Sequence, residues 1–152
     1  MAGAVSLTGK DVIVLNGRVM KNFADATLAE LTFDTNLMEV KASKDGNTIY
    51  ALNEQGRVSE LKLRLLLGSS DDKFLNSMLA SMKSDPSGFI LILGSFTKRV
   101  GDGAGNSSLV VYQCVGGAFS KMPAAKSSAA GDTDQSVVEW AIKFGSADRS
   151  VM

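Results

Sequence analysis

The chain has 152 residues, and its 16 Lys and Arg balance 16 Asp and Glu, so the formal net charge is zero. A hydrophobic fraction of 45% is ordinary for a globular protein and excludes disorder throughout, and the length suits a single domain over residues 1–152. A neutral chain with scattered basic residues has no field or stripe that would attract a nucleic-acid backbone or an anionic membrane.

The side chains available for catalysis are few. The chain has no histidine, which removes the commonest general base and metal ligand. The single cysteine, Cys114, excludes an internal disulfide and a multi-thiolate metal site, and its apolar surroundings predict a small buried residue rather than a reactive thiol. Asp71 and Asp72 are neighbours at the start of a predicted helix, and we interpret both as solvated acids. We predict a protein that is not an enzyme, with no metal site and no cofactor.

Targeting and membrane signals are absent from the sequence. Its longest unbroken apolar run, residues 89–93, is far shorter than the ~20 residues that cross a bilayer as a helix. The first seven residues lack the charged opening and apolar core of a signal peptide. We therefore expect synthesis in the cytoplasm and no association with a membrane.

The first elements are predicted to be strands. Residues 12–15 form a β-type run, and Asn16-Gly17 tolerates the positive φ angles of a type I′ turn, so residues 18–20 return as a hairpin. Residues 26–34 alternate with a period of two, with Leu31 and Phe33 on the more apolar side.

Residues 34–57 form a long, mostly polar stretch with a thin apolar pattern on either side of an Asp45-Gly46 turn. We interpret it as an extended hairpin arm; the alternative is an irregular surface loop. Loops of this length without structure are uncommon in compact domains and are usually functional. Eight extended residues reach about 25 Å, far enough to contact a neighbouring molecule.

Residues 58–67 predict a half-buried strand, and residues 70–84 predict the one helix. In the strand, alternate residues are Leu61, Leu63, Leu65 and Leu67, whereas Glu60, Lys62 and Arg64 face the other side. A helix is the rival prediction for this stretch, but a period of two fits better. In the helix, one stripe packs on the sheet in preference to forming a partner groove, and it consists of Phe74, Leu75, Met78, Leu79 and Met82.

The last third of the chain is predicted to be strands and turns. The apolar run 89–93 should be buried on both sides or lie beneath the helix. A glycine-rich turn, residues 101–106, leads into a returning strand at 109–115; its spacing does not match a dinucleotide-binding loop. Residues 123–134 predict a mobile loop. The closing strand, 137–144, places Val138, Trp140, Ile142 and Phe144 opposite Glu139 and Lys143.

These elements predict a mainly β fold, a β-sandwich or small barrel, with one flanking amphipathic α-helix and a long extended hairpin. Their order resembles the tail tube proteins of contractile-tailed bacteriophages and, more distantly, the tube subunits of bacterial injection systems. The resemblance is carried by residues 11–16, the 34–57 extension, the 70–83 helix before Asp85-Pro86, and the 137–144 strand.

The resemblance implies a virion protein of the tail tube, made in the host bacterial cytoplasm. Six subunits would form a ring, and stacked rings would form a hollow tube through which DNA passes without sequence-specific binding. Further partners would be the tail sheath, tail terminator, baseplate and tape-measure proteins. The 34–57 arm would reach the adjacent ring, and its candidate inter-ring residues are Asn36, Leu37, Met38, Lys44, Asp45, Asn47, Tyr50, Asn53 and Glu54.

Candidates for the lumen or an intersubunit face are Glu60, Lys62, Arg64, Glu139 and Lys143. A conduit for DNA is expected to be negative inside, and the three basic residues in this set depart from that pattern. The alternative function is a monomeric β-barrel that binds a small ligand or carbohydrate, with residues 34–57 and 101–106 as its mouth. Trp140 lies on the apolar side of its strand, which favours a place in the core over a sugar-stacking platform.

Overall fold

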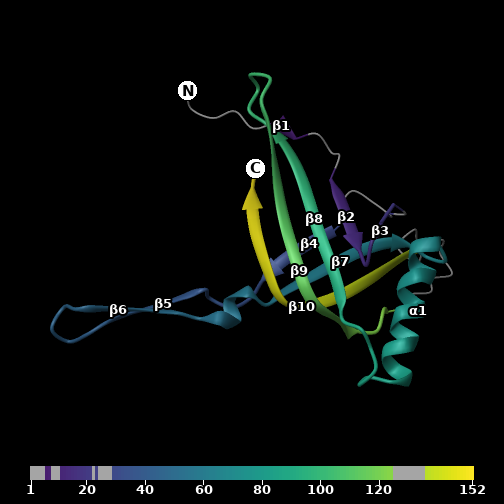
Figure 1. Ribbon diagram of the computed structural model, residues 1–152, viewed down its shortest axis with the longest axis horizontal. Coiled ribbons are helices and arrows are strands. Elements are labelled where there is room, and N and C mark those ends of the chain that lie inside the picture. The colour runs from purple at the N-terminus through teal and green to yellow at the C-terminus, as the bar shows by residue number, and fades with distance from the viewer. Residues whose placement is uncertain (1–5, 8–10, 22, 24–28, 125–135) are drawn as a thin grey trace, which may run out of the picture.

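The computed structural model describes residues 6–7, 11–21, 23, 29–124 and 136–152. They form a large antiparallel sheet, a separate two-stranded hairpin and one α-helix (Figure 1). The predicted mainly β class with one helix and a long hairpin is confirmed. Within the described residues β3 and β4, at the two ends of the strand order, do not pair, so the sheets are sandwich-like and the small-barrel option is wrong.

The strand order of the main sheet is β3-β2-β8-β9-β10-β7-β4, with β1 paired to β8. The strands of this sheet are β1 (Ser6–Leu7), β2 (Val12–Leu15), β3 (Arg18–Val19), β4 (Ala29–Phe33), β7 (Ser59–Leu66), β8 (Ile92–Gly101), β9 (Ser107–Lys121) and β10 (Val137–Val151). The hairpin consists of β5 (Met38–Ala42) and β6 (Thr48–Leu52), followed by the 3₁₀ turn η1 (Glu54–Arg57). The helix α1 spans Ser70–Ser84.

Strand β10 joins the two halves of the main sheet. Its first part, from Val137 to Phe144, pairs with β7, and from Ala141 to Val151 it pairs with β9, with a register shift at Ala141/Ile142. In Figure 1, β7 and the first part of β10 cross the direction of β8 and β9. The sheet therefore bends along β10, and its concave side holds the core.

The core lies between the two halves of the sheet and α1. The period-two pattern of β7 is confirmed, because Leu61, Leu63 and Leu65 are buried. The helix contributes Leu75 and Leu79 to the core, so its stripe packs on the sheet as predicted. The Trp140 side chain is 1% exposed and its ring lies 5.3 Å from that of Phe119. Its place in the core is confirmed.

The two acids at the start of α1 bind other elements. The Asp71 side chain is 1% exposed, accepts a hydrogen bond of 2.9 Å from Arg18 Nε in an ion pair, and accepts another of 2.6 Å from the backbone N–H of Lys21. The Asp72 carboxylate accepts a hydrogen bond of 2.9 Å from the Trp140 indole. The interpretation of Asp71 as a solvated acid is wrong, because the docking of the helix against β3 removes it from water and supplies the compensating charge.

The Asn16-Gly17 turn has the predicted geometry, with φ angles of 49° and 81°. The turn also fixes the start of β8. Asn16 donates its backbone N–H to the Leu93 carbonyl at 2.8 Å, and its side-chain oxygen accepts a hydrogen bond of 2.9 Å from the Leu93 N–H. A hairpin that is local in sequence thus positions a strand that lies 77 residues further along the chain.

The prediction that residues 89–93 are buried on both sides is wrong. Only Ile92 is fully buried, whereas Ile90 is 84% exposed and Leu93 is 59% exposed. Strand β8 begins at Ile92, so only one of its faces meets the core. Leu67, which follows β7, is also exposed rather than buried. The predicted mobile loop, 123–134, lies outside the described residues from 125 onwards.

Gly117 lies where β9 passes the Phe144 ring, and a Cβ atom there would come within 2.6 Å of Phe144 Cε1. We expect Gly117→Ala to lower the free energy of unfolding by about 1–3 kcal/mol, since the packed core must shift to admit the methyl group. Gly145→Ala is the matched control, because its nearest contact would be an ordinary 3.8 Å, and it should change stability by about 0.5 kcal/mol or less. Urea unfolding of both variants measures the difference; equal losses would contradict the packing argument.

Candidate self-assembly interfaces

The hairpin β5–β6, here called the arm, projects away from the rest of the protein (Figure 1). All ten residues of its two strands are exposed. Its pairing places Met38 opposite Leu52 and Val40 opposite Tyr50. Opposite residues of an antiparallel pair share a face. One face of the arm is therefore uncharged, and we call it the apolar arm face: Met38, Val40, Ala42, Thr48, Tyr50 and Leu52.

The apolar arm face is exposed to solvent in the isolated chain. Its four large side chains, Met38, Val40, Tyr50 and Leu52, are 48% to 68% exposed. The other face of the arm carries Glu39 and Lys41. A two-stranded hairpin without a covering layer is marginally stable in water, so contact with another surface would stabilise this one.

The base of the arm is held by close contacts. The backbone N–H of Asn53 donates to the Leu37 carbonyl at 2.7 Å, and the Asn53 side chain caps η1 by accepting from the Gln55 N–H at 3.1 Å. Gly56 is buried, and a Cβ atom there would lie 2.5 Å from the Leu37 Cα. Arg57 lies 3.4 Å from Glu54 and 3.8 Å from Asp148 on β10. These contacts direct the arm outward.

The structure places the nine arm candidates in three groups. Lys44, Asp45 and Asn47 lie at the tip, Met38 and Tyr50 lie on the apolar arm face, and the other four lie at the base. The base residues are Asn36, Leu37, Asn53 and Glu54. Sequence reasoning left Val40 and Leu52 out of the candidate set, although the strict period of two within each arm strand would have identified both.

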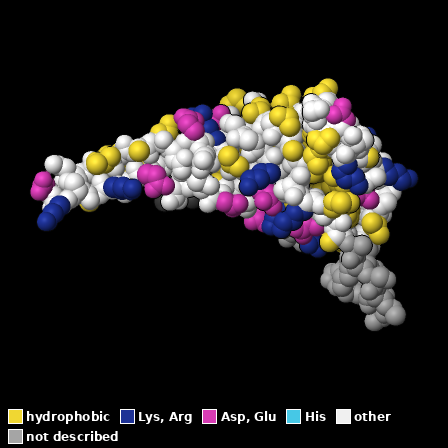
Figure 2. All heavy atoms as spheres, turned by 90° about the horizontal axis from the view of Figure 1, so that it is seen from below, with side chains coloured by type: hydrophobic (Ala, Val, Ile, Leu, Met, Phe, Trp, Pro, Cys, Tyr) yellow, Lys and Arg dark blue, Asp and Glu magenta, His cyan; other side chains and the backbone are white. Residues whose placement is uncertain are grey.

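The five candidates for the lumen or an intersubunit face come together on one face of β7 and β10. The register pairs Glu139 with Arg64 and Lys143 with Glu60, while Lys62 lies between the two rows. Arg64 and Glu139 form an ion pair of 3.6 Å. We call these five residues the mixed-charge face, and they lie on the side of β7 and β10 that faces away from the core. Figure 2 shows charged side chains of both signs close together on the body of the protein, and hydrophobic side chains both on the body and along the arm.

Strand β10 has a free edge over residues 145–151. Within the described residues, β7 pairs with β10 only as far as Phe144, and nothing replaces it beyond that point. Leu109 and Met152 exchange both backbone hydrogen bonds, at 3.0 and 2.9 Å. Because an antiparallel ladder alternates, the N–H and C=O groups of Ala147, Arg149 and Val151 point away from β9. The edge borders a groove of about 550 Å³ at the base of the arm.

The described residues offer little chemistry for catalysis or metal binding. They contain no group of three or more acidic, cysteine or histidine side chains that could hold a metal ion. Hydrogen bonds from the Asn106 side chain and the Ala104 N–H lower the pKa of Asp102, but this carboxylate only organises the β8–β9 turn. No helix among the described residues has the length and the apolar composition that a membrane span needs.

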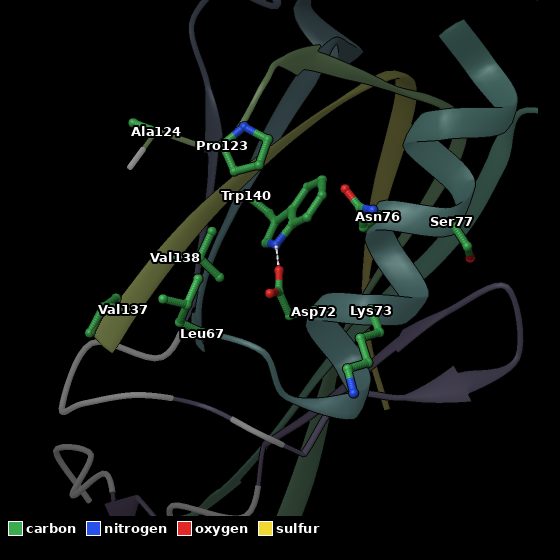
Figure 3. Close-up of a pocket in the computed structure, with 10 residues that line it drawn as sticks. All are labelled: Leu67, Asp72, Lys73, Asn76, Ser77, Pro123, Ala124, Val137, Val138 and Trp140. Carbon is green, nitrogen blue, oxygen red and sulfur yellow. Dashed lines mark hydrogen bonds between the residues drawn. The ribbon is translucent and has the colours of Figure 1, made fainter. Parts of the chain in front are cut away.

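A cavity of about 370 Å³ lies between α1 and the ends of β7 and β10 (Figure 3). Asp72, Lys73 and Asn76 line it from the helix, and Trp140 lines it from β10. The Trp140 indole is nearly fully buried, and its only N–H group is bonded to Asp72. The ring therefore cannot offer its flat face to a sugar, and the Trp140–Asp72 contact instead connects α1 to the sheet.

Cys114 is buried, as the sequence predicts, and burial raises its pKa to about 11. A raised pKa keeps the neutral thiol dominant at every pH below that value, so the thiolate fraction at pH 7 is on the order of 10⁻⁴. We expect a thiol reagent to label the folded protein very slowly at pH 7 and rapidly once denaturant unfolds it. Rapid labelling of the native state would show that Cys114 is accessible and ionised.

Known proteins resemble this chain in sequence and in fold. The family model of the bacteriophage PhiTE tail tube protein matches residues 21–151, which is most of the chain. The chain belongs to this tail tube family. The match includes the arm, α1 and all of β7 to β10, so the mixed-charge face and the free edge of β10 also lie within the matched residues.

Among solved structures, the fold is similar to the sheath/tube terminator of an extracellular contractile injection system, PVC, in its extended state. The TM-score is 0.61 at 12% sequence identity, and the match covers 93% of this chain and 94% of the other. None of the curated proteins matches the sequence. Membership of the family supports a structural role in a phage tail and makes the protein a virion component.

Proposed function

We propose that this protein is the subunit of a phage tail inner tube, and that it assembles into stacked hexameric rings that form a conduit for DNA. The observation that supports this most directly is the arm, whose apolar face is exposed in the isolated chain and whose base is rigidly held. Such an arm is suited to contact with another copy of the chain.

Lateral contacts within a ring are supported by the free edge of β10. Unpaired N–H and C=O groups on an edge strand favour pairing with another chain. A ring closes when one strand edge of each subunit pairs with a different strand edge of its neighbour. The outer edge of β4 is a second unpaired strand edge in the described residues. The mixed-charge face of β7 and β10 would then lie against the lumen or a neighbouring subunit, where the Arg64–Glu139 ion pair reduces the attraction of its basic residues for passing DNA.

The proposed partners outside the tube are the sheath, the terminator, the baseplate and the tape-measure protein. The tube would be built in the host cytoplasm and function in the virion. A net charge of zero removes the long-range repulsion between copies and so favours dense self-association.

Replacement of the arm tests the axial contacts. The Asn53 N–H already bonds to the Leu37 carbonyl, so a two-residue Asn-Gly turn in place of residues 38–52 can close the chain without disturbing the main sheet. We expect wild-type protein to form tubes in negative-stain electron micrographs. The shortened variant should form rings that do not stack, with an unchanged urea midpoint for the body of the protein.

Three results would count against this proposal or change it. A wild-type protein that stays monomeric at high concentration, across salt conditions and with added tube seeds, contradicts it. Wild-type rings that never stack would favour a capping role such as the one named for the structural relative. Normal tubes from the shortened variant would show that the arm is not the axial contact.

Arg149 tests the lateral contacts. Its backbone N–H points toward the free edge of β10, so Arg149→Pro removes one edge donor without removing a bond to β9. We expect this variant to remain folded and to fail to close rings. Arg149→Ala is the matched control, because it keeps the N–H while losing the same side chain and its 3.1 Å bond to Tyr112 Oη. Equal ring formation by the two variants, measured by native mass spectrometry, would show that the edge is not used.

A further inference from the structure

The convex side of the β2–β8–β9 part of the sheet, opposite the core, carries an uncharged patch that ends at Arg99, the next residue after Thr97 on this face of β8. The register places Val14, Ser95 and Gln113 in one row, and Val12 and Thr97 in the next. Leu93 and Val115 continue the surface beside the first row. We call this the outer sheet face, and its residues are Val12, Val14, Leu93, Ser95, Thr97, Gln113 and Val115.

Most of the outer sheet face is exposed or half-buried, although Val111, which continues the second row on β9, is buried. Val12, Leu93, Gln113 and Val115 are exposed, and the other members are half-buried. A shallow groove of about 280 Å³ crosses it, lined only by uncharged residues, and Gly17 and Gly94 lie along it. The exposure of Leu93, which contradicts a simple prediction from the sequence, belongs to this surface.

We infer that the apolar arm face of one copy packs on the outer sheet face of another copy and supplies its missing second layer. The inference rests on the proposed self-assembly and adds to it the surface that receives the arm. Domains are built from at least two packed layers, and each of these two surfaces is a β layer that lacks one. None of the residues named for either face is charged, so these residues can meet without the desolvation of a charge.

The dimensions of the two surfaces agree. Five extended residues make each arm strand about 17 Å long, and the two strands lie about 5 Å apart. On the receiving side, the three strands span about 10 Å across, and the four residues of β2 run about 13 Å. The arm therefore covers the outer sheet face as one sheet covers another in a sandwich, with the two layers about 10 Å apart.

The receiving face must belong to a second molecule. The arm points away from its own body (Figure 1), and the contacts of Gly56 and Asn53 at its base hold it in that direction. Because the two faces are different surfaces, the contact is heterologous, and each added copy leaves one arm and one face open. One contact of this size is smaller than the ~1,600 Å² of a standard interface, so it becomes strong only when repeated around a ring.

Cross-linking between two variants, each with one added cysteine, tests this contact. Thr48→Cys places a thiol on the apolar arm face, and Gln113→Cys places one on the outer sheet face, both at exposed positions. The native Cys114 stays silent because burial raises its pKa to about 11. The two variants are mixed, assembled, and treated with a short bismaleimide that spans the distance between packed sheets. We expect a heterodimer band in the assembled mixture that is lost when the mixture is diluted until no assemblies form.

The matched control replaces Gln113→Cys by Ala80→Cys, an exposed position on α1 outside both faces. Tubes that form normally but give no Thr48–Gln113 band, or a band no stronger than the Ala80 control, would overturn the inference and leave the proposed function standing. A wild-type protein that forms no assembly would overturn both the inference and the proposed function. A heterodimer band of the same strength in dilute, unassembled protein would show that the cross-link forms by chance collision and not at a packed contact, which also overturns the inference.

Discussion

A β-sheet in water needs cover for its apolar faces and partners for its edges, and this chain provides both only for part of its main sheet. The concave side is covered by α1 and by the bend of the sheet itself, which encloses Trp140 and Phe144. Most of the convex side of β2–β8–β9, the outer edge of the second half of β10 and the apolar arm face are left without cover or partner among the described residues. These are the surfaces that we propose take part in self-assembly.

The covered part of the sheet depends on a few polar contacts that hold distant elements in place. Asp71 and Asp72 begin the same helix, and they bind Arg18 on β3 and Trp140 on β10. Asn16 connects the first hairpin to the start of β8. With the helix fixed in this way, the bend of the sheet is also fixed, and the arm and the β10 edge keep defined directions relative to each other through Arg57 and Asp148.

Much of this architecture could be predicted from local pattern. The Asn16-Gly17 turn, the alternation of β7 and the stripe of α1 each depend on residues close in sequence. The burial of Asp71 could not be predicted, because its partner Arg18 lies 53 residues away and only the fold brings the two together. The exposure of Leu93 was missed for a related reason: an apolar run does not reveal that one side of its strand is open. The charged residues of β7 and β10 were predicted to share a face because strand alternation is strict, but pairing Glu139 with Arg64 required the register.

The position of β10 in the sheet has a consequence for how the protein folds during synthesis. This strand lies between β9 and β7 in space, yet it is made after both of them. Neither half of the sheet can bury Trp140, Ile142 or Phe144 until the ribosome has released residues 137–151. Folding of the body is therefore delayed until nearly the whole described chain is available, as expected for a fold dominated by long-range contacts. The arm is translated early and its pairing is local, so its strands can form before the body exists. The surface that we propose to receive it consists of β2, β8 and β9, but it stays unsupported from the inside until β10 is made, so a growing chain cannot yet receive the arm of a finished subunit.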